Sequence, residues 1–154
     1  FTYRVIAGGV AAGVALSFWL LAFSMFFFTG LAFAKRYSEL QVLIGSKKAS
    51  TPGRGYQVQD VNVITSVGPA SGLLGVLVFA LYINSAEVVQ IYPEPRFLWL
   101  ICPVLLYWVT RVWFLAAREQ LDDDPVVFAI KDRISYLAGI IAVACVAAAK
   151  LWPT

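Results

Sequence analysis

The chain has 154 residues, of which 60% are hydrophobic and 14% are charged, and its mean hydropathy is +0.77. Soluble domains carry about 25% charged residues, so this composition excludes an ordinary soluble domain. The net charge of +3 is too small to favour nucleic acid binding, and a sequence without histidine offers neither imidazole acid–base chemistry nor histidine metal ligands.

Apolar segments of helical length recur along the chain. In chain order, helices are predicted at residues 1–14, 17–33, 61–83, 97–117 and 135–151. About 20 apolar residues suffice to cross the roughly 30 Å of a bilayer core. The first segment is expected to be the end of a helix that begins before Phe1. The prediction is therefore an all-α integral membrane bundle with about four complete transmembrane helices plus part of a fifth.

Small residues indicate where these helices pack closely. The segment FTYRVIAGGVAAGV is rich in glycine and alanine, and Gly68, Gly72 and Gly75 lie on or near one face of the helix predicted at 61–83. Small residues let the backbones of membrane helices approach each other. We therefore expect close helix contacts at these positions.

Charge is concentrated in two predicted loops, residues 34–60 and 118–134. Alternation of the spans puts both loops on one side of the membrane, and they carry eight basic residues against two on the other side. Basic loops are retained in the cytoplasm. The expected location is a bacterial inner membrane, with both charged loops cytoplasmic. The eight basic residues are Lys35, Arg36, Lys47, Lys48, Arg54, Arg118, Lys131 and Arg133.

The stretch AKRYSEL ends the first complete apolar run. Lys35 and Glu39 are four residues apart, so they share a helix face and could pair. One interpretation is an interfacial salt bridge, with Arg36 reaching towards lipid headgroups. The other is a site in which Lys35 and Arg36 bind phosphate and Glu39 holds a metal ion or orients the lysine. Spacing alone leaves both interpretations open.

Three further residues are candidates for anion binding near the first loop. Arg54 and Tyr56 lie in a stretch of irregular composition that could fold over an anionic substrate. Arg4 lies within an apolar helix, where a cation is costly unless it faces a polar cavity or lies near a helix end.

The second charged loop ends in a further pair of candidates. Asp132 and Arg133 precede the last span and could reach back towards the first charged loop. Arg111 lies near the cytoplasmic end of its own span. Asp124 followed by Pro125 is typical of a helix N-cap with proline in the first turn.

Taken together, RVIAGGVAAGVALSFWLL, AKRYSEL and DPVVFAIKDR make the chain resemble the UbiA superfamily of intramembrane prenyltransferases. The branch that it is most similar to is that of decaprenyl-phosphate phosphoribosyltransferase. The resemblance implies nine helices around a central cavity and two polar motifs whose Mg²⁺ bridges to a substrate diphosphate. The chain would correspond to the end of the fifth helix and to helices six to nine.

Two departures from that family pattern shape the functional hypothesis. The first motif, Asn-x-x-x-Asp-x-x-x-Asp, is not in this sequence and would lie upstream of Phe1. In place of the second, Asp-x-x-x-Asp, stands Lys35-x-x-x-Glu39. A charged lysine cannot bind Mg²⁺, but it can neutralise phosphate, which suits a donor such as phosphoribosyl diphosphate.

The resemblance implies a transferase that moves a prenyl or phosphoribosyl group, with a polyprenyl lipid as one substrate. It implies catalytic roles for Lys35 and Glu39, with Glu39 also the metal ligand. Implied substrate contacts come from Arg4, Arg36, Tyr37, Arg54, Tyr56, Asp132 and Arg133. The missing N-terminal helices of the same protein would complete the site, so this chain alone is expected to be inactive. A noncatalytic membrane subunit of a larger complex is the alternative, and homo-oligomerisation is left open.

Overall fold

The computed structural model describes residues 3, 7, 17–45, 57–121 and 125–151, and every regular element in that part of the chain is a helix. Within these described ranges, four helical segments are long and apolar enough to cross a membrane: Phe18–Gly45, Val58–Ile83, Pro95–Ala117 and Arg133–Leu151. The predicted all-α bundle is thereby confirmed. The helix predicted at residues 1–14 lies outside the described residues, apart from Tyr3 and Ala7.

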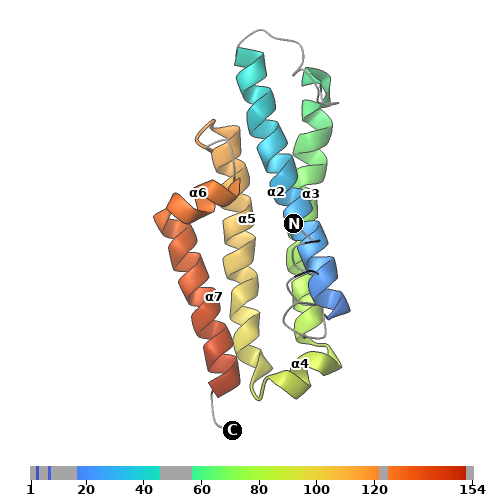
Figure 1. The fold of residues 1–154 in the computed structure, drawn as a ribbon, viewed down its shortest axis with the longest axis vertical. Helices are drawn as coiled ribbons and strands as arrows, with labels where there is room; N and C mark the ends of the chain where they lie inside the picture. The colour runs from blue at the N-terminus through green and yellow to red at the C-terminus, as the bar shows by residue number, and fades with distance from the viewer. Residues whose placement is uncertain (1–2, 4–6, 8–16, 46–56, 122–124, 152–154) are drawn as a thin grey trace.

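The bundle consists of two helix pairs (Figure 1). Helix α2 (Phe18–Gly45) packs along α3 (Val61–Ile83), and α5 (Ile101–Ala117) packs against α7 (Arg133–Leu151). The short helix α6 (Pro125–Lys131) crosses the beginning of α7. At the opposite end of the bundle, α4 (Ala86–Ile91) and the 3₁₀ segment η2 (Pro95–Leu100) connect α3 to α5. A second 3₁₀ turn, η1 (Val58–Asp60), leads into α3.

Contact between α2 and α3 is backbone against backbone. A Cβ atom added to Gly30 would lie 2.8 Å from the backbone nitrogen of Gly72, and one added to Gly75 would lie 3.1 Å from that of Phe27. The α2–α3 pair can be this close only because these positions carry no side chain. Gly68 plays a related role towards α5, since its Cβ would lie 2.2 Å from the Trp113 ring. The close contacts predicted for the α3 glycines are confirmed.

Two apolar clusters form the core. One lies between α2, α3 and α5 and includes Tyr37, Ile64, Trp108 and Val112. The other lies near α4 and η2, where Ile83, Val88, Leu98, Ile101, Cys145 and Ala149 meet. In the apolar windows of the four spanning segments, 11% to 33% of residues are buried. Most of the apolar surface therefore faces outward, as a bilayer or a partner requires.

The predicted loops are too long. Residues 34–45 of the predicted loop 34–60 continue α2 without a break, because AKRYSELQVLI contains good helix formers and the helix ends only at Gly45. Within 118–134, α6 begins at Pro125 and α7 begins at Arg133, two residues before the predicted start. Asp124, the predicted N-cap, lies outside the described residues. Between the helices predicted at 61–83 and 97–117, the chain forms the short helix α4.

The start of the third span also differs from the prediction. Residues 95–100 are 3₁₀ and α5 proper begins at Ile101, because Pro103 has no N–H for the carbonyl of Trp99 and its ring clashes with that carbonyl, which prevents regular α-helix before it.

Candidate functional site

The charged residues of AKRYSEL lie on a helix rather than in a loop. Arg36 pairs with Glu39 one turn later, and the two side chains remain 29% and 20% exposed. Lys35 is half-buried on the same helix. At about 1.5 Å per residue, Lys35 lies roughly 26 Å along α2 from Phe18, close to the distance at which a helix leaves the apolar core of a bilayer. The charged turn thus lies about one bilayer-core thickness along the helix from Phe18.

Tyr37 points away from Lys35 and Glu39. Two residues along an α-helix correspond to a rotation of about 200°, so Tyr37 lies on the opposite face from both. Its ring is 7% exposed and packs at 6.1 Å, centroid to centroid, from Trp113, and its hydroxyl accepts a hydrogen bond of 2.6 Å from Gln41 Nε2. The structure therefore separates Tyr37 from the two residues with which it was grouped.

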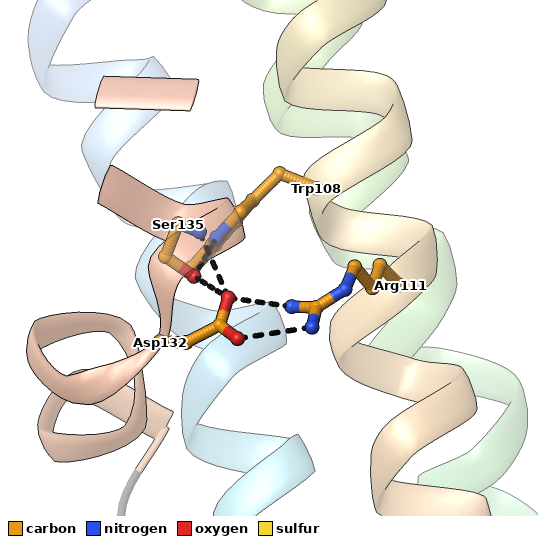
Figure 2. Close-up of polar contacts among 4 residues, drawn as sticks. All are labelled: Trp108, Arg111, Asp132 and Ser135. Carbon is orange, nitrogen blue, oxygen red and sulfur yellow. Dashed lines mark hydrogen bonds and ion pairs between the residues drawn. The ribbon is translucent and has the colours of Figure 1, made fainter. Parts of the chain in front are cut away.

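A polar network joins α5 to the beginning of α7 (Figure 2). Arg111 donates two parallel hydrogen bonds to Asp132, of 2.7 Å to Oδ2 and 3.0 Å to Oδ1. Asp132 Oδ2 also accepts from the backbone nitrogen of Ser135 at 2.8 Å and from its hydroxyl at 2.9 Å. The Ser135 hydroxyl in turn accepts from Trp108 Nε1 at 2.8 Å. Asp132 thus caps α7 and holds Arg111 at the same time.

The electrostatics of this network favour an ionised Asp132. Burial opposes ionisation, but the hydrogen bonds from Arg111 and Ser135 and the Arg111 charge outweigh it, so the pKa of Asp132 lies below its ordinary value. The guanidinium also lies over the Phe128 ring, 5.6 Å from its centroid. Arg111 and Asp132 are only 17% and 14% exposed. All these contacts are internal, so Asp132 is a structural residue of the α5–α6–α7 corner.

The remaining predicted residues are placed as follows. Arg133 is the first residue of α7 and is exposed, so it is accessible to a ligand. Arg4, Arg54 and Tyr56 lie outside the described residues. Within residues 17–45, 57–121 and 125–151, no group of three carboxylate or thiol side chains is placed to hold a metal ion. In this part of the chain, Glu39 is thus not part of a group of three such side chains.

Trp108 and Ser135 were missed by the sequence reasoning, although two signals pointed to them. Asp132-x-x-Ser135 directly before an apolar run has the spacing of an N-cap, whose side chain binds the nitrogen three residues on. Trp108 and Arg111 are three residues apart and so share a face of α5. What the sequence could not show is that this face of α5 meets the beginning of α7.

Comparisons with known proteins give two relatives and no match to a family model or a solved structure. The chain is 36% identical over 140 residues to an uncharacterized protein, y4nM, of Sinorhizobium fredii. It is 31% identical over 136 residues to the nodulation protein NoeC of Azorhizobium caulinodans. The matches cover 90% and 88% of this chain, but only 27% and 44% of those proteins. The chain thus spans less than half the length of either relative.

Proposed function

We propose that this chain forms part of a membrane-embedded, Mg²⁺-dependent transferase of the UbiA type. Such an enzyme moves a prenyl or phosphoribosyl group between a diphosphate donor and an acceptor, and one of its substrates is a polyprenyl lipid. The observation that carries the proposal is the position of Lys35, Arg36 and Glu39 on α2. Two cations and a carboxylate within about one turn of a helix supply the groups that bind phosphate and a Mg²⁺ ion associated with it.

The place of these charges suits a reaction between a lipid and a water-soluble substrate. Helix α2 has 28 residues, a length of about 42 Å, which exceeds the roughly 30 Å of a bilayer core. If α2 enters the bilayer near Phe18, the charged turn would lie about where the helix emerges, and α2 continues beyond it to Gly45. A phosphate at this depth could belong to a lipid whose chain stays in the bilayer.

Each residue has a role that follows from its chemistry. Arg36 and Lys35 would neutralise phosphate oxygens, the arginine through paired N–H groups and the lysine as a point charge. The pairing of Arg36 with Glu39 keeps both side chains in reach of one site. A phosphate that binds Arg36 in place of Glu39 would leave the Glu39 carboxylate available for a metal ion.

The residues present fit a Mg²⁺ ion only in part. Mg²⁺ often binds through one or two carboxylates together with substrate phosphates and water, and Glu39 supplies one such carboxylate. When bound, the ion would stabilise negative charge on the departing diphosphate. Arg133, exposed at the start of α7, is a second phosphate-binding candidate. We propose an inner-membrane location with these groups on the cytoplasmic side.

Transfer assays on the protein expressed from its full reading frame test the proposal. Lys35→Ala and Glu39→Ala are each expected to lower the rate about 100-fold or more, since each removes one electrostatic group from the transition state. Lys150→Ala and Glu87→Ala, at the opposite end of the bundle, are the matched controls and should keep the wild-type rate. Wild-type rates in both site variants would refute the assignment.

A noncatalytic membrane subunit is the second candidate. It is favoured by α7, where only 11% of the apolar window is buried within the described structure. A partner helix would cover that face. Stable co-purification of a second protein, combined with no transfer of any prenyl or phosphoribosyl donor, would favour the subunit over the enzyme.

A further inference from the structure

A groove separates α3 from α5 on a face of the molecule that neither the α2 charges nor the Asp132 network uses. Its volume is about 310 Å³, which falls in the range of about 300–1,000 Å³ typical of small-molecule sites. Tyr37, Val109 and Trp113 line it, and each of them also packs into the apolar core. The groove depends on Gly68, because a Cβ there would strike the Trp113 ring.

The groove opens outward through an apolar rim. Leu73 and Phe114 line it, and they are 42% and 58% exposed. Both belong to segments that are apolar enough to cross a membrane, so an exposed rim here suits contact with lipid. A ligand that enters from the side must therefore be apolar along most of its length.

One end of the groove lies beside the charged end of α5. Helices α3 and α5 run in opposite directions, so Thr65 of α3 and Ala117 of α5 line the same end. Pro69 has no N–H, so the carbonyl of Thr65 loses its usual helical donor. Next to Ala117 stands Arg118, which is exposed and whose guanidinium lies 5.8 Å from the centroid of the Phe114 ring on the rim.

Local backbone geometry fixes Arg118 in this position. Helix α5 ends in a Schellman motif, in which Gln120 N donates to Leu115 O at 2.9 Å and Glu119 N donates to Ala116 O at 3.1 Å. Glu119 adopts the left-handed conformation that this motif requires, with φ of 56°. The chain therefore stops being helical directly after the cation, at the end of the apolar span.

We propose that the α3–α5 groove binds an anionic membrane phospholipid, with one acyl chain between Leu73 and Phe114 and the headgroup phosphate against Arg118. The apolar walls match the chain, and the Arg118 cation beside one end of the groove matches the phosphate. This is a bound structural lipid, separate from any substrate at Lys35 and Glu39, and it stands independently of the proposed enzymatic function.

The test measures lipid binding to the delipidated full chain in detergent. Native mass spectrometry is used to count bound phosphatidylglycerol, and phosphatidylcholine with the same acyl chains is the neutral comparison. We expect one tightly bound phosphatidylglycerol per chain. Arg118→Gln should weaken that binding about fivefold, the effect of one basic residue near an anionic headgroup, and should leave phosphatidylcholine unchanged.

Matched variants distinguish lipid binding in the groove from nonspecific lipid binding. Thr110 lines the groove and is exposed, so Thr110→Trp should fill it and abolish binding of both lipids. Leu106→Trp, one turn earlier on α5 and outside the groove, and Arg96→Gln, at the opposite end of the bundle, should bind phosphatidylglycerol like the wild type. Circular dichroism in detergent checks that each variant is folded.

The proposal fails if Thr110→Trp, correctly folded, binds phosphatidylglycerol like the wild type, or if Arg96→Gln weakens binding as much as Arg118→Gln. Equal affinity of the wild type for the two lipids would overturn the headgroup assignment. A measurement without mutation uses phosphatidylglycerol with a photoreactive group on its acyl chain. Crosslinks should map to Thr110, Trp113 or Phe114, and crosslinks confined to α7 would also overturn the proposal.

Discussion

Breaking the Arg111–Asp132 pair should show how strongly it holds the α5–α6–α7 corner. The designed changes are Asp132→Asn, Arg111→Met and the double variant. Asparagine is as good an N-cap as aspartate, so Asp132→Asn keeps the cap on α7 and removes the ionic part of the contact. Arg111→Met keeps an apolar side chain of similar length and removes both hydrogen bonds to the carboxylate.

The expected magnitude follows from the geometry and the burial. A hydrogen bond to a charged group contributes about 1.5–3 kcal/mol, and removing one partner of a buried ion pair costs about 3–5 kcal/mol. Because the two side chains are still 17% and 14% exposed, we expect the lower end, about 3 kcal/mol for Asp132→Asn and about 2–3 kcal/mol for Arg111→Met. The double variant leaves no unpaired charge, so it should cost about 3 kcal/mol rather than the sum.

The assay is equilibrium unfolding in mixed detergent micelles, followed by circular dichroism, with the four proteins forming a double-mutant cycle. Arg118→Met is the matched control. Arg118 lies over an aromatic ring at 5.8 Å, as Arg111 does at 5.6 Å, but Arg118 is exposed, and its variant should change stability by no more than about 0.5 kcal/mol. A coupling energy of about 2 kcal/mol or more is expected, and additivity of the single variants within about 0.5 kcal/mol would refute the reasoning.

Three further predictions concern pH, helix contact and a turn. Because the pKa of Asp132 is lowered in the folded protein, its ionisation contributes stability that is complete above about pH 4 and is lost as pH falls through that lowered pKa. Below about pH 4, the free energy of unfolding should therefore fall more steeply for the wild type than for Asp132→Asn. Gly30→Ala should cost about 1–3 kcal/mol because its Cβ meets the α3 backbone, whereas Gly139→Ala, with no atom within 4 Å, should stabilise α7 by about 0.5–1 kcal/mol; equal effects in the same unfolding assay would contradict the packing account. Glu119→Gly should raise stability by about 0.5–1 kcal/mol by relieving its left-handed backbone, and a loss of stability on denaturation would count against the Schellman assignment.

The positions of the long helices could be predicted because they depend on the apolar surroundings of the chain. Long apolar runs form helices when no water is present to satisfy backbone groups, and glycines recurring on one face allow close approach. Residues 61–83 are the clearest case, since α3 begins and ends where the sequence indicates. Helix ends near charged residues were predicted less well, because α2 continues as a helix through Lys35, Arg36 and Glu39 and does not stop at Lys35.

The sequence alone determined that this chain is an all-α bundle, that Lys35, Arg36 and Glu39 lie within one turn or so of each other, and that Gly68 and Gly72 face a neighbour. Such features depend on composition and on spacing along one helix, which local geometry fixes. Only the tertiary structure decided that Arg111 meets Asp132, 21 residues away, and that Tyr37 turns from the charged face towards Trp113. Those contacts depend on how separate helices are rotated and placed against each other, and that arrangement comes from packing across the whole bundle, which no single segment encodes.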